Sequence, residues 1–164
     1  MKILNDRQVR QKIKRLATEI LENNFEEPVI ILAGINNNGM AFALLLMEEL
    51  RLLTKIPVVL TRIRLNPANP VGEPVKLEMD AEELKDKSII VVDDVANTGR
   101  TMFYAFRPLL EVLPKKVETA VLVDRTHKSF PVEVNYVGMS LATTLLEDID
   151  VRIRDTAEFS VELN

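Results

Sequence analysis

Ser88-Ile89-Ile90-Val91-Val92-Asp93-Asp94-Val95-Ala96-Asn97-Thr98-Gly99-Arg100-Thr101 is the stretch that decides the fold of this 164-residue chain. Its first five residues form a short apolar run rich in β-branched side chains, which is typical of a strand buried in a parallel sheet. A loop with one glycine follows, and apolar spacing then predicts a helix over 101–113. A strand that leads through a short loop into a helix is the repeating unit of α/β folds.

The same unit recurs on both sides of this stretch. Apolar runs predict further strands at 28–33, 56–60, 117–123 and 134–137, and apolar spacing predicts helices at 6–24 and 40–53. The first helix has Asn5 or Asp6 as its cap. We therefore expect the α/β class: a Rossmann-like, doubly wound, mostly parallel sheet of about five strands.

Composition limits the possible chemistry. At 47% hydrophobic residues the chain suits one soluble domain over 1–164. It has no cysteine and a single histidine, so a resident metal would need carboxylates and substrate oxygens, which favours Mg²⁺. The polar start and the lack of a long apolar run predict a cytoplasmic protein without a membrane span. The net charge of -4 gives no global reason to expect nucleic-acid binding.

One connection is too long for a compact α/β domain. Residues 61–80 contain Pro67, Pro70, Gly72 and Pro74, which disfavour a regular element. Long connections of this kind often close over active sites. We expect a long flexible loop here, acting as a lid.

The loop after the 88–92 strand has the chemistry of an anion site. The amides from Ala96 to Thr101 can converge on a phosphate, assisted by the helix dipole and by threonine hydroxyls. Asp93 and Asp94 cannot bind phosphate, because like charges repel. They can accept hydrogen bonds from ribose hydroxyls and so help to orient these around Mg²⁺, which makes them an indirect metal site. The alternative of a receiver-type protein is disfavoured, because Met139 follows Gly138 where that fold needs a lysine after a later strand.

Residues 91–101 resemble the phosphoribosyl pyrophosphate (PRPP) signature of type I phosphoribosyltransferases: an apolar strand, two acids, and then Thr-Gly-x-Thr. The stretches 120–128, 130–131 and 136–138 are similar to the pyrimidine operon attenuator and uracil phosphoribosyltransferase group, and the match runs from Ile3 to about Ile153. The resemblance implies transfer of phosphoribose from PRPP to a nucleobase, with uracil leading, and with Mg²⁺ and Asp93 and Asp94 at the catalytic centre. It also implies a small hood, formed by the N-terminal segment and about 138–164.

The resemblance assigns further residues to the site. The residues that would bind the PRPP phosphate are Val95, Ala96, Asn97, Thr98, Gly99, Arg100 and Thr101. The pyrophosphate loop would be Asn36, Asn37, Asn38 and Gly39, and the flexible loop would bring Arg62 and Arg64. The base pocket would include Asp124, Arg125, Val137 and Gly138. For Asp124 and Arg125, an ion pair at a strand end is an equal alternative. Two family features are missing: an arginine in the pyrophosphate loop, and the lysine and proline that follow the last strand.

Three points stay open. A non-catalytic regulator of this type would bind RNA through a basic face, here Lys12, Lys14, Arg15, His127 and Lys128. A sensor would bind PRPP or a nucleotide without turnover. By analogy we expect a homodimer or a higher oligomer, and the apolar residues Met102, Phe103 and Phe106 could belong to an interface or to the core.

Overall fold

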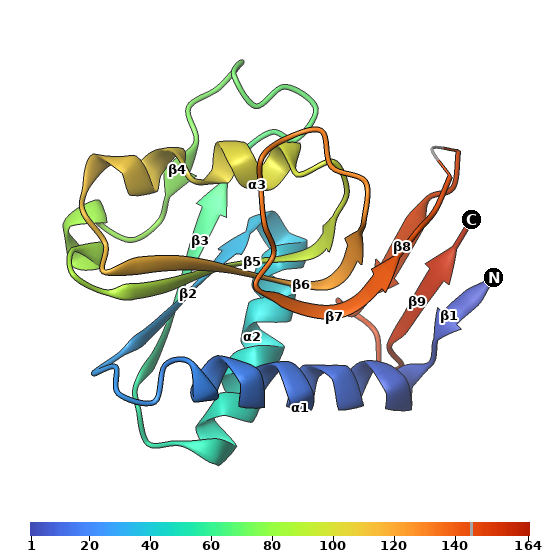
Figure 1. The fold of residues 1–164 in the computed structure, drawn as a ribbon, viewed down its shortest axis with the longest axis horizontal. Helices are drawn as coiled ribbons and strands as arrows, with labels where there is room; N and C mark the ends of the chain where they lie inside the picture. The colour runs from blue at the N-terminus through green and yellow to red at the C-terminus, as the bar shows by residue number, and fades with distance from the viewer. Residues whose placement is uncertain (145) are drawn as a thin grey trace.

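A six-stranded sheet forms the centre of the protein and runs in the order β4-β3-β2-β5-β6-β7 (Figure 1). The structure is a computed structural model that describes residues 1–144 and 146–164. The strands are β2 (Ile30–Ile35), β3 (Val58–Arg64), β4 (Lys76–Leu77), β5 (Ser88–Ala96), β6 (Lys116–Arg125) and β7 (Tyr136–Leu141). All neighbours pair in parallel except the short β4, which is antiparallel to β3. The predicted α/β class is confirmed.

Helices cover both faces of this sheet (Figure 1). They are α1 (Asp6–Glu22), α2 (Asn36–Leu53) and α3 (Arg100–Ala105), with the short 3₁₀ helices η1 (Ala81–Leu84) and η2 (Arg107–Glu111). Alternate residues of each strand supply the two cores: Ile90 and Val92 pack with α1 and α2, whereas Ile89 and Val91 pack with α3 and η2. This two-sided burial explains why the central strands are continuously apolar. Among the described residues, no helix combines the length and the apolar character needed to cross a membrane.

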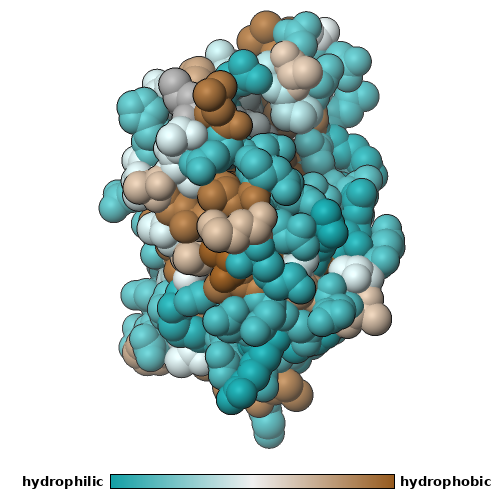
Figure 2. All heavy atoms as spheres, turned by 90° about the vertical axis from the view of Figure 1, so that its right-hand side faces the viewer, coloured by the Kyte–Doolittle hydropathy of each residue, from teal (hydrophilic) through white to brown (hydrophobic). Residues whose placement is uncertain are grey.

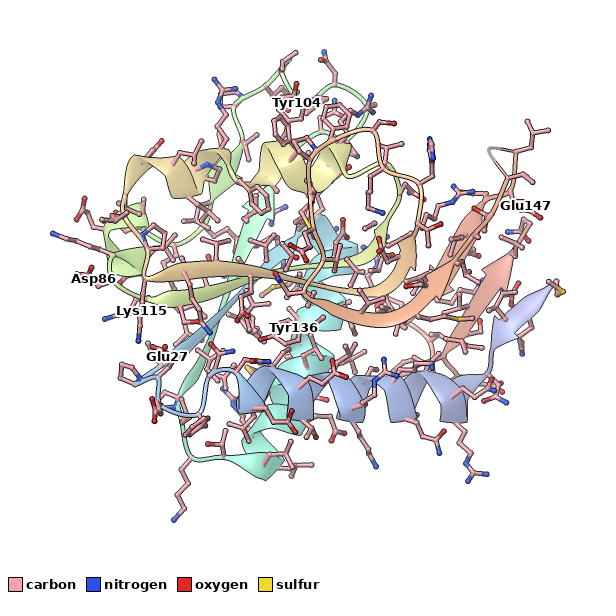
Figure 3. All side chains as sticks on the ribbon, in the orientation of Figure 1. Glu27, Asp86, Tyr104, Lys115, Tyr136 and Glu147 are labelled. Atoms are coloured by element: carbon pink, nitrogen blue, oxygen red, sulfur yellow. The ribbon has the colours of Figure 1, made fainter. Side chains whose placement is uncertain are left out.

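Helix α1 begins where the sequence predicts. Asn5 is its cap, because its side chain accepts from the Gln8 amide at 2.9 Å while the Gln8 side chain accepts from the Asn5 amide. At its far end Asn24 is buried and accepts from the Ser88 hydroxyl at 2.6 Å, which fixes the helix to the start of β5. Beside it, Tyr136 donates to Glu118, and burial together with that carboxylate raises the pKa of Tyr136 (Figure 3). These contacts lie at the amino-terminal edge of the sheet and are structural.

A second, small sheet joins the two ends of the chain. Its strands β1 (Lys2–Leu4), β8 (Ile149–Arg152) and β9 (Ser160–Leu163) lie in the order β1-β9-β8, beside β7 (Figure 1). Leu4, Ile149 and Val161 turn into the main core. The outer side is mostly hydrophilic around a central apolar patch (Figure 2). We call this sheet the hood, together with residues 142–144, 146–148 and 153–159, which lead into and join its strands. These residues come from the segments that the resemblance assigns to a hood.

Several predicted boundaries are wrong. The expected helix over 101–113 ends at Ala105 and resumes as η2, because Pro108 has no amide to continue an α-helix. The helix expected to start at Met40 starts at Asn36, and the strand expected to end at Val92 ends at Ala96. Strand β3 continues to Arg64, so the first residues of the expected flexible loop are paired strand.

The three apolar residues expected in either an interface or the core differ in burial. Met102 is buried, and Phe106 packs against the same core. Phe103 is 41% exposed, and its ring centroid lies 5.5 Å from those of Tyr104 and Phe130. Phe103 alone of the three therefore remains a candidate for an interface.

Candidate active site

A cleft opens where the winding of the sheet reverses direction. Strand β2 pairs with β5 only as far as Gly34 and Val92, because the chain then turns into α2. On the other side of β5, pairing with β6 continues to Ala96. The last residues of β5 therefore have an open edge, and ligands of open α/β sheets bind at such a switch point. The cleft measures about 400 Å³ and is lined by the end of β5, the first turn of α2, Pro67, and two hood residues.

The two acids stand together on this open edge. Asp93 and Asp94 are half-buried, and both line the cleft. The Asp94 amide donates to the Asp93 carboxylate at 2.9 Å, and the Val95 amide donates to Asp94 at 2.8 Å. Burial, together with the Asp94 charge, raises the pKa of Asp93 well above its ordinary value of 3.8. Burial also raises the pKa of Asp94, an effect that Arg154 partly offsets. This surplus of buried negative charge suits hydroxyl donors and a nearby cation.

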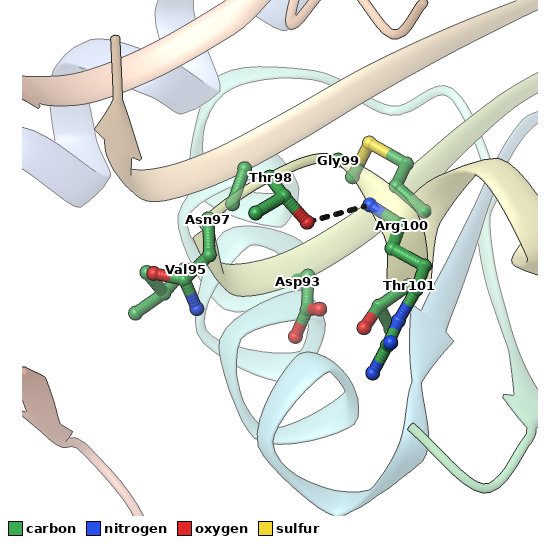
Figure 4. Close-up of a pocket in the computed structure, with 9 residues that line it drawn as sticks. Asp93, Val95, Asn97, Thr98, Gly99, Arg100 and Thr101 are labelled. Atoms are coloured by element: carbon green, nitrogen blue, oxygen red, sulfur yellow. Dashed lines mark hydrogen bonds between the residues drawn. The ribbon is translucent and has the colours of Figure 1, made fainter. Parts of the chain in front are cut away.

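The loop after β5 encloses a small hollow of about 40 Å³, lined by Asp93 and residues 95–102 (Figure 4). Gly99 makes the turn, with φ at 88°, a conformation that other residues adopt only with strain. Among the described residues, the amides of Thr98, Gly99 and Thr101 have no hydrogen-bond acceptor. Free amides around a hollow of this size fit a phosphate group.

The outer atoms of the same loop are engaged by the scaffold. The Thr98 carbonyl accepts from the amides of Ser129 and Phe130 at 3.0 and 3.1 Å. The Asn97 side chain accepts from Arg125 at 3.3 Å. These contacts hold the loop in shape while its amides stay available. Helix α3 has only six residues, so its dipole contributes less than the predicted longer helix would.

The predicted pyrophosphate loop is instead the first turn of α2. Asn37 to Gly39 are helical, Asn36 begins the turn with a φ of 52°, and Asn36, Asn37 and Asn38 line the cleft. Ile35 precedes them and provides no side-chain cap, so the first amides of this 18-residue helix lack a capping partner. The positive end of a long helix therefore meets the cleft. This end gives the cleft positive character, although the turn itself contains no arginine.

Arg62 and Arg64 lie on β3, outside the flexible loop and away from the cleft lining. Arg62 donates to the Asn37 side chain at 3.0 Å; among the described residues its buried Nε has no hydrogen-bond partner, although it lies 3.9 Å from Glu78 Oε1. Arg64 pairs with Glu78 at 3.0 Å. Arg62 thus supports the first turn of α2, whereas direct contact of either arginine with pyrophosphate stays a prediction.

None of the predicted base-pocket residues lines the cleft, and their contact with a base stays a prediction. Asp124 pairs with Lys128 at 2.6 Å, so it forms an ion pair, but not with Arg125. The carbonyls of Val137 and Gly138 both accept from Arg15 at 2.8 Å. These bonds also occupy Arg15 and Lys128, two members of the basic face considered for RNA.

Arg125 holds the hood. It donates to the Thr143 hydroxyl at 2.6 Å and to the Thr144 carbonyl at 2.9 Å, and also bonds the Glu147 carbonyl. Together with its bond to Asn97, these contacts tie the hood to the phosphate loop. Arg125 is therefore a positioning residue in this structure.

The acids can accommodate Mg²⁺ only with help from a substrate. Among residues 1–144 and 146–164, no group of three carboxylates or imidazoles could hold a metal ion. Mg²⁺ needs about six oxygen ligands, and two carboxylates leave most of these to substrate and water. Burial raises the pKa values of Asp93 and Asp94, so a cation bound nearby would favour their charged carboxylate forms.

Sequence reasoning named four residues of the cleft lining nowhere among its site residues: Ile35, Pro67, Ile149 and Arg154. Ile35 adjoins the predicted pyrophosphate loop and Pro67 lies in the expected lid, whereas Ile149 and Arg154 are distant along the sequence from every predicted site residue. Both belong to the hood segment, more than 50 positions beyond the paired acids, as the numbering of the sequence shows. Arg154 is the one arginine that lines the cleft in the described part of the chain. The sequence Arg152-Ile153-Arg154 places two alternating cations in a row, and nothing local distinguishes the one that faces the acids.

Comparisons with known proteins show the family and the fold of the chain. A family model for the phosphoribosyl transferase domain matches residues 1–156. The chain is 32% identical over 158 residues to the "Bifunctional protein PyrR" of Streptococcus agalactiae serotype Ia, covering 93% of this chain and 90% of that one. It is 35% identical over 166 residues to the protein of the same name from Clostridium acetobutylicum, covering 96% and 92%.

Solved structures share the fold at lower identity. A hypoxanthine-guanine phosphoribosyltransferase from Bacillus anthracis superposes with a TM-score of 0.75 at 20% identity, covering 97% of this chain and 95% of that one. The hypoxanthine phosphoribosyltransferase of Trypanosoma cruzi gives 0.75 at 17% identity, covering 98% and 95%. At these identities the likeness concerns the fold.

Proposed function

This chain belongs to the phosphoribosyl transferase domain family, and from that membership we propose that it transfers the phosphoribosyl group of PRPP to a nucleobase, with uracil as the leading acceptor. The observation that carries the proposal is one cleft that combines paired acids, a hollow lined by free amides, and an uncapped helix start. Each part matches one part of PRPP: the ribose hydroxyls, the 5′-phosphate and the pyrophosphate.

The residues act mainly by positioning and charge. The amides of Thr98, Gly99 and Thr101 hold the 5′-phosphate, and the first turn of α2 faces the pyrophosphate. Asp93 and Asp94 accept hydrogen bonds from the ribose hydroxyls. As the bond to pyrophosphate lengthens, the sugar gains positive charge, which these carboxylates stabilise. Mg²⁺, when bound with PRPP, would neutralise charge on the leaving pyrophosphate.

The acceptor base is tested by a pyrophosphate-release screen. The protein is mixed with PRPP, Mg²⁺ and, in turn, uracil, hypoxanthine and guanine. We expect the highest kcat/KM with uracil, because the resemblance in sequence is to the uracil-using group. Purine turnover alone would overturn uracil as the acceptor. PRPP binding without turnover on any base would overturn the proposed enzyme activity and favour a sensor of PRPP.

Arg154 gives a prediction specific to this chain. It lines the cleft, and its charge lowers the pKa of Asp94. Arg154→Ala should weaken PRPP binding about fivefold, since an exposed arginine that pairs with phosphate contributes on the order of 1 kcal/mol. Isothermal titration with PRPP and Mg²⁺ measures this.

Arg152→Ala is the matched control. Arg152 is two residues away, but it pairs with Asp150 at 2.8 Å and with Glu162 at 3.5 Å, within the hood. It should bind PRPP as the unaltered protein does. Equal PRPP affinities for both variants and the unaltered protein would remove Arg154 from the site.

RNA binding is the second candidate function. The relatives named above are called bifunctional, and exposed Lys14 and His127, with half-buried Lys12, remain on the basic face. A regulator would bind RNA with an affinity that falls steeply as salt is added. Binding that is absent, or insensitive to salt, would rule out this function.

A further inference from the structure

We propose that Arg100 is a positioning residue that latches the lid over the cleft. The lid is residues 65–75, the segment between β3 and β4 that lies above α3 (Figure 1). Its role as a cover for PRPP rests on the proposed function, but the latch itself is a property of the protein without ligand.

The latch is one hydrogen bond between distant parts of the chain. Arg100 is the first residue of α3, and its Nη2 donates to the Pro67 carbonyl at 2.7 Å. Pro67 lies on the lid and lines the cleft. A bond from a guanidinium is stronger than one between neutral groups, yet this one is exposed, so it can break and reform.

A second contact fixes the base of the lid. The Asn36 side chain donates to the Leu65 carbonyl at 2.9 Å and accepts from the Leu65 amide at 3.0 Å. Leu65 is buried, and this pair of bonds continues the edge of β3 by one residue. The lid is therefore held firmly at Leu65 and more loosely, two residues later, at Pro67.

Between these points and β4 the lid has a shape of its own. The Asn69 amide donates to the Asn66 carbonyl, and the Gly72 amide donates to the Asn69 carbonyl, both at 3.1 Å. The Ala68 amide also donates to the Asn66 side chain at 3.1 Å. Such internally bonded loops move as units. Release at Pro67 would thus free the part of the lid beyond the Leu65 contact.

Both contacts come from the segments assigned to the two ends of PRPP. Arg100 belongs to the phosphate loop, and Asn36 belongs to the first turn of α2. The position of the lid is consequently coupled to both phosphate sites before any ligand arrives. Arg100 occupies the variable position x of Thr-Gly-x-Thr. Its side chain therefore has a role at the lid that is separate from the proposed binding of phosphate by the loop amides.

Hydrogen exchange of the ligand-free protein tests the latch. In Arg100→Ala, the amides of Asn69 and Gly72 should exchange roughly fivefold faster, equivalent to about 1 kcal/mol, while those of β5 stay unchanged. Arg107→Ala removes an exposed arginine from η2 and should leave the exchange of the lid as it is. Arg100→Lys, which keeps one donor and the charge, should give an intermediate rate.

Unchanged lid exchange in Arg100→Ala would overturn the proposal. If Arg100→Ala also loses protection in β5, the substitution has disturbed the fold, and the test then rests on Arg100→Lys. Lid exchange in Arg100→Lys equal to that of the unaltered protein would count against the latch. Because no substrate is present, the result does not depend on the pyrophosphate-release screen. A negative pyrophosphate-release screen would not contradict the latch, and unchanged hydrogen exchange in Arg100→Ala would not contradict the proposed transferase activity.

Discussion

Asp94→Asn is expected to lower kcat/KM about a hundredfold or more, the usual loss when a charge-stabilising group at a reaction centre is removed. Asparagine has nearly the same shape, and its oxygen can still accept from the Val95 amide, which Asp94 accepts at 2.8 Å. What it lacks is the negative charge opposite the developing positive charge of the sugar. Steady-state pyrophosphate release measures the loss.

The same substitution should raise the stability of the folded protein at neutral pH. Asp94 has a raised pKa in the folded state because it is half-buried, and its charge also raises the pKa of Asp93. A carboxyl whose folded pKa is raised favours folding most below its unfolded pKa, where it is protonated. This contribution is lost as the pH rises through the folded pKa. An asparagine side chain does not ionise, so the variant does not lose folding stability at position 94 as the pH rises.

Denaturant unfolding at two pH values tests the sign. The gain in free energy of unfolding that Asp94→Asn gives over the unaltered protein should be larger near pH 8 than near pH 4, a pH close to the ordinary aspartate pKa of 3.8. Asp86→Asn serves as the control, because Asp86 is exposed at the other end of the sheet (Figure 3), and its φ of 59° suits both residues. Undiminished turnover in Asp94→Asn would contradict the role assigned to the acid, whatever its stability.

Gly39→Ala is expected to damage both stability and activity, although helix propensity alone predicts the opposite. Alanine is favoured over glycine within helices by about 1 kcal/mol. Here, however, a Cβ would lie 2.5 Å from the Val92 carbonyl oxygen and 3.3 Å from the Gly34 carbonyl carbon. Both atoms belong to the backbone of the sheet, so the start of α2 must move away.

That movement should lower the free energy of unfolding by about 2 kcal/mol, a usual cost of overpacking. It should also weaken PRPP binding, because Val92 adjoins Asp93, and Asn37 and Asn38 move with the helix. Gly72→Ala is the comparison, since its Cβ would meet only the flexible Asn69 side chain, at 2.2 Å. It should change stability little. Equal stability losses in the two variants would show that the contact with Val92 is not what matters.

The sequence predicted those parts of the protein whose signals are local. The run from Ser88 to Val92 identifies a strand buried on both faces, and the structure confirms it at the centre of the sheet. The spacing of apolar residues in α1, with Asn5 as cap, is confirmed in the same way. The acids and the phosphate loop were found because they follow one another along the chain, so one short stretch carries the whole signal.

Element ends were predicted less well, because they depend on neighbours. Whether β5 stops at Val92 or continues to Ala96 depends on β6, which still pairs with it after β2 has turned away. The start of α2 depends on Asn36, whose side chain takes the place of a strand partner for Leu65, the residue that follows β3. The end of α3 is the exception, since Pro108 is visible in the sequence and should have ended the predicted helix.

By itself the sequence determined the α/β class, the paired acids and the amide-rich loop, because hydrophobic periodicity and a contiguous motif act over a few residues. Only the tertiary structure decided which cations reach these groups. Arg154 faces the acids, Arg100 reaches the lid, and Arg125 and Arg15 hold carbonyls of the scaffold. An arginine looks the same at all four positions in the sequence. Its role follows from which carbonyls and carboxylates surround its guanidinium, and folding brings those groups there from distant parts of the chain.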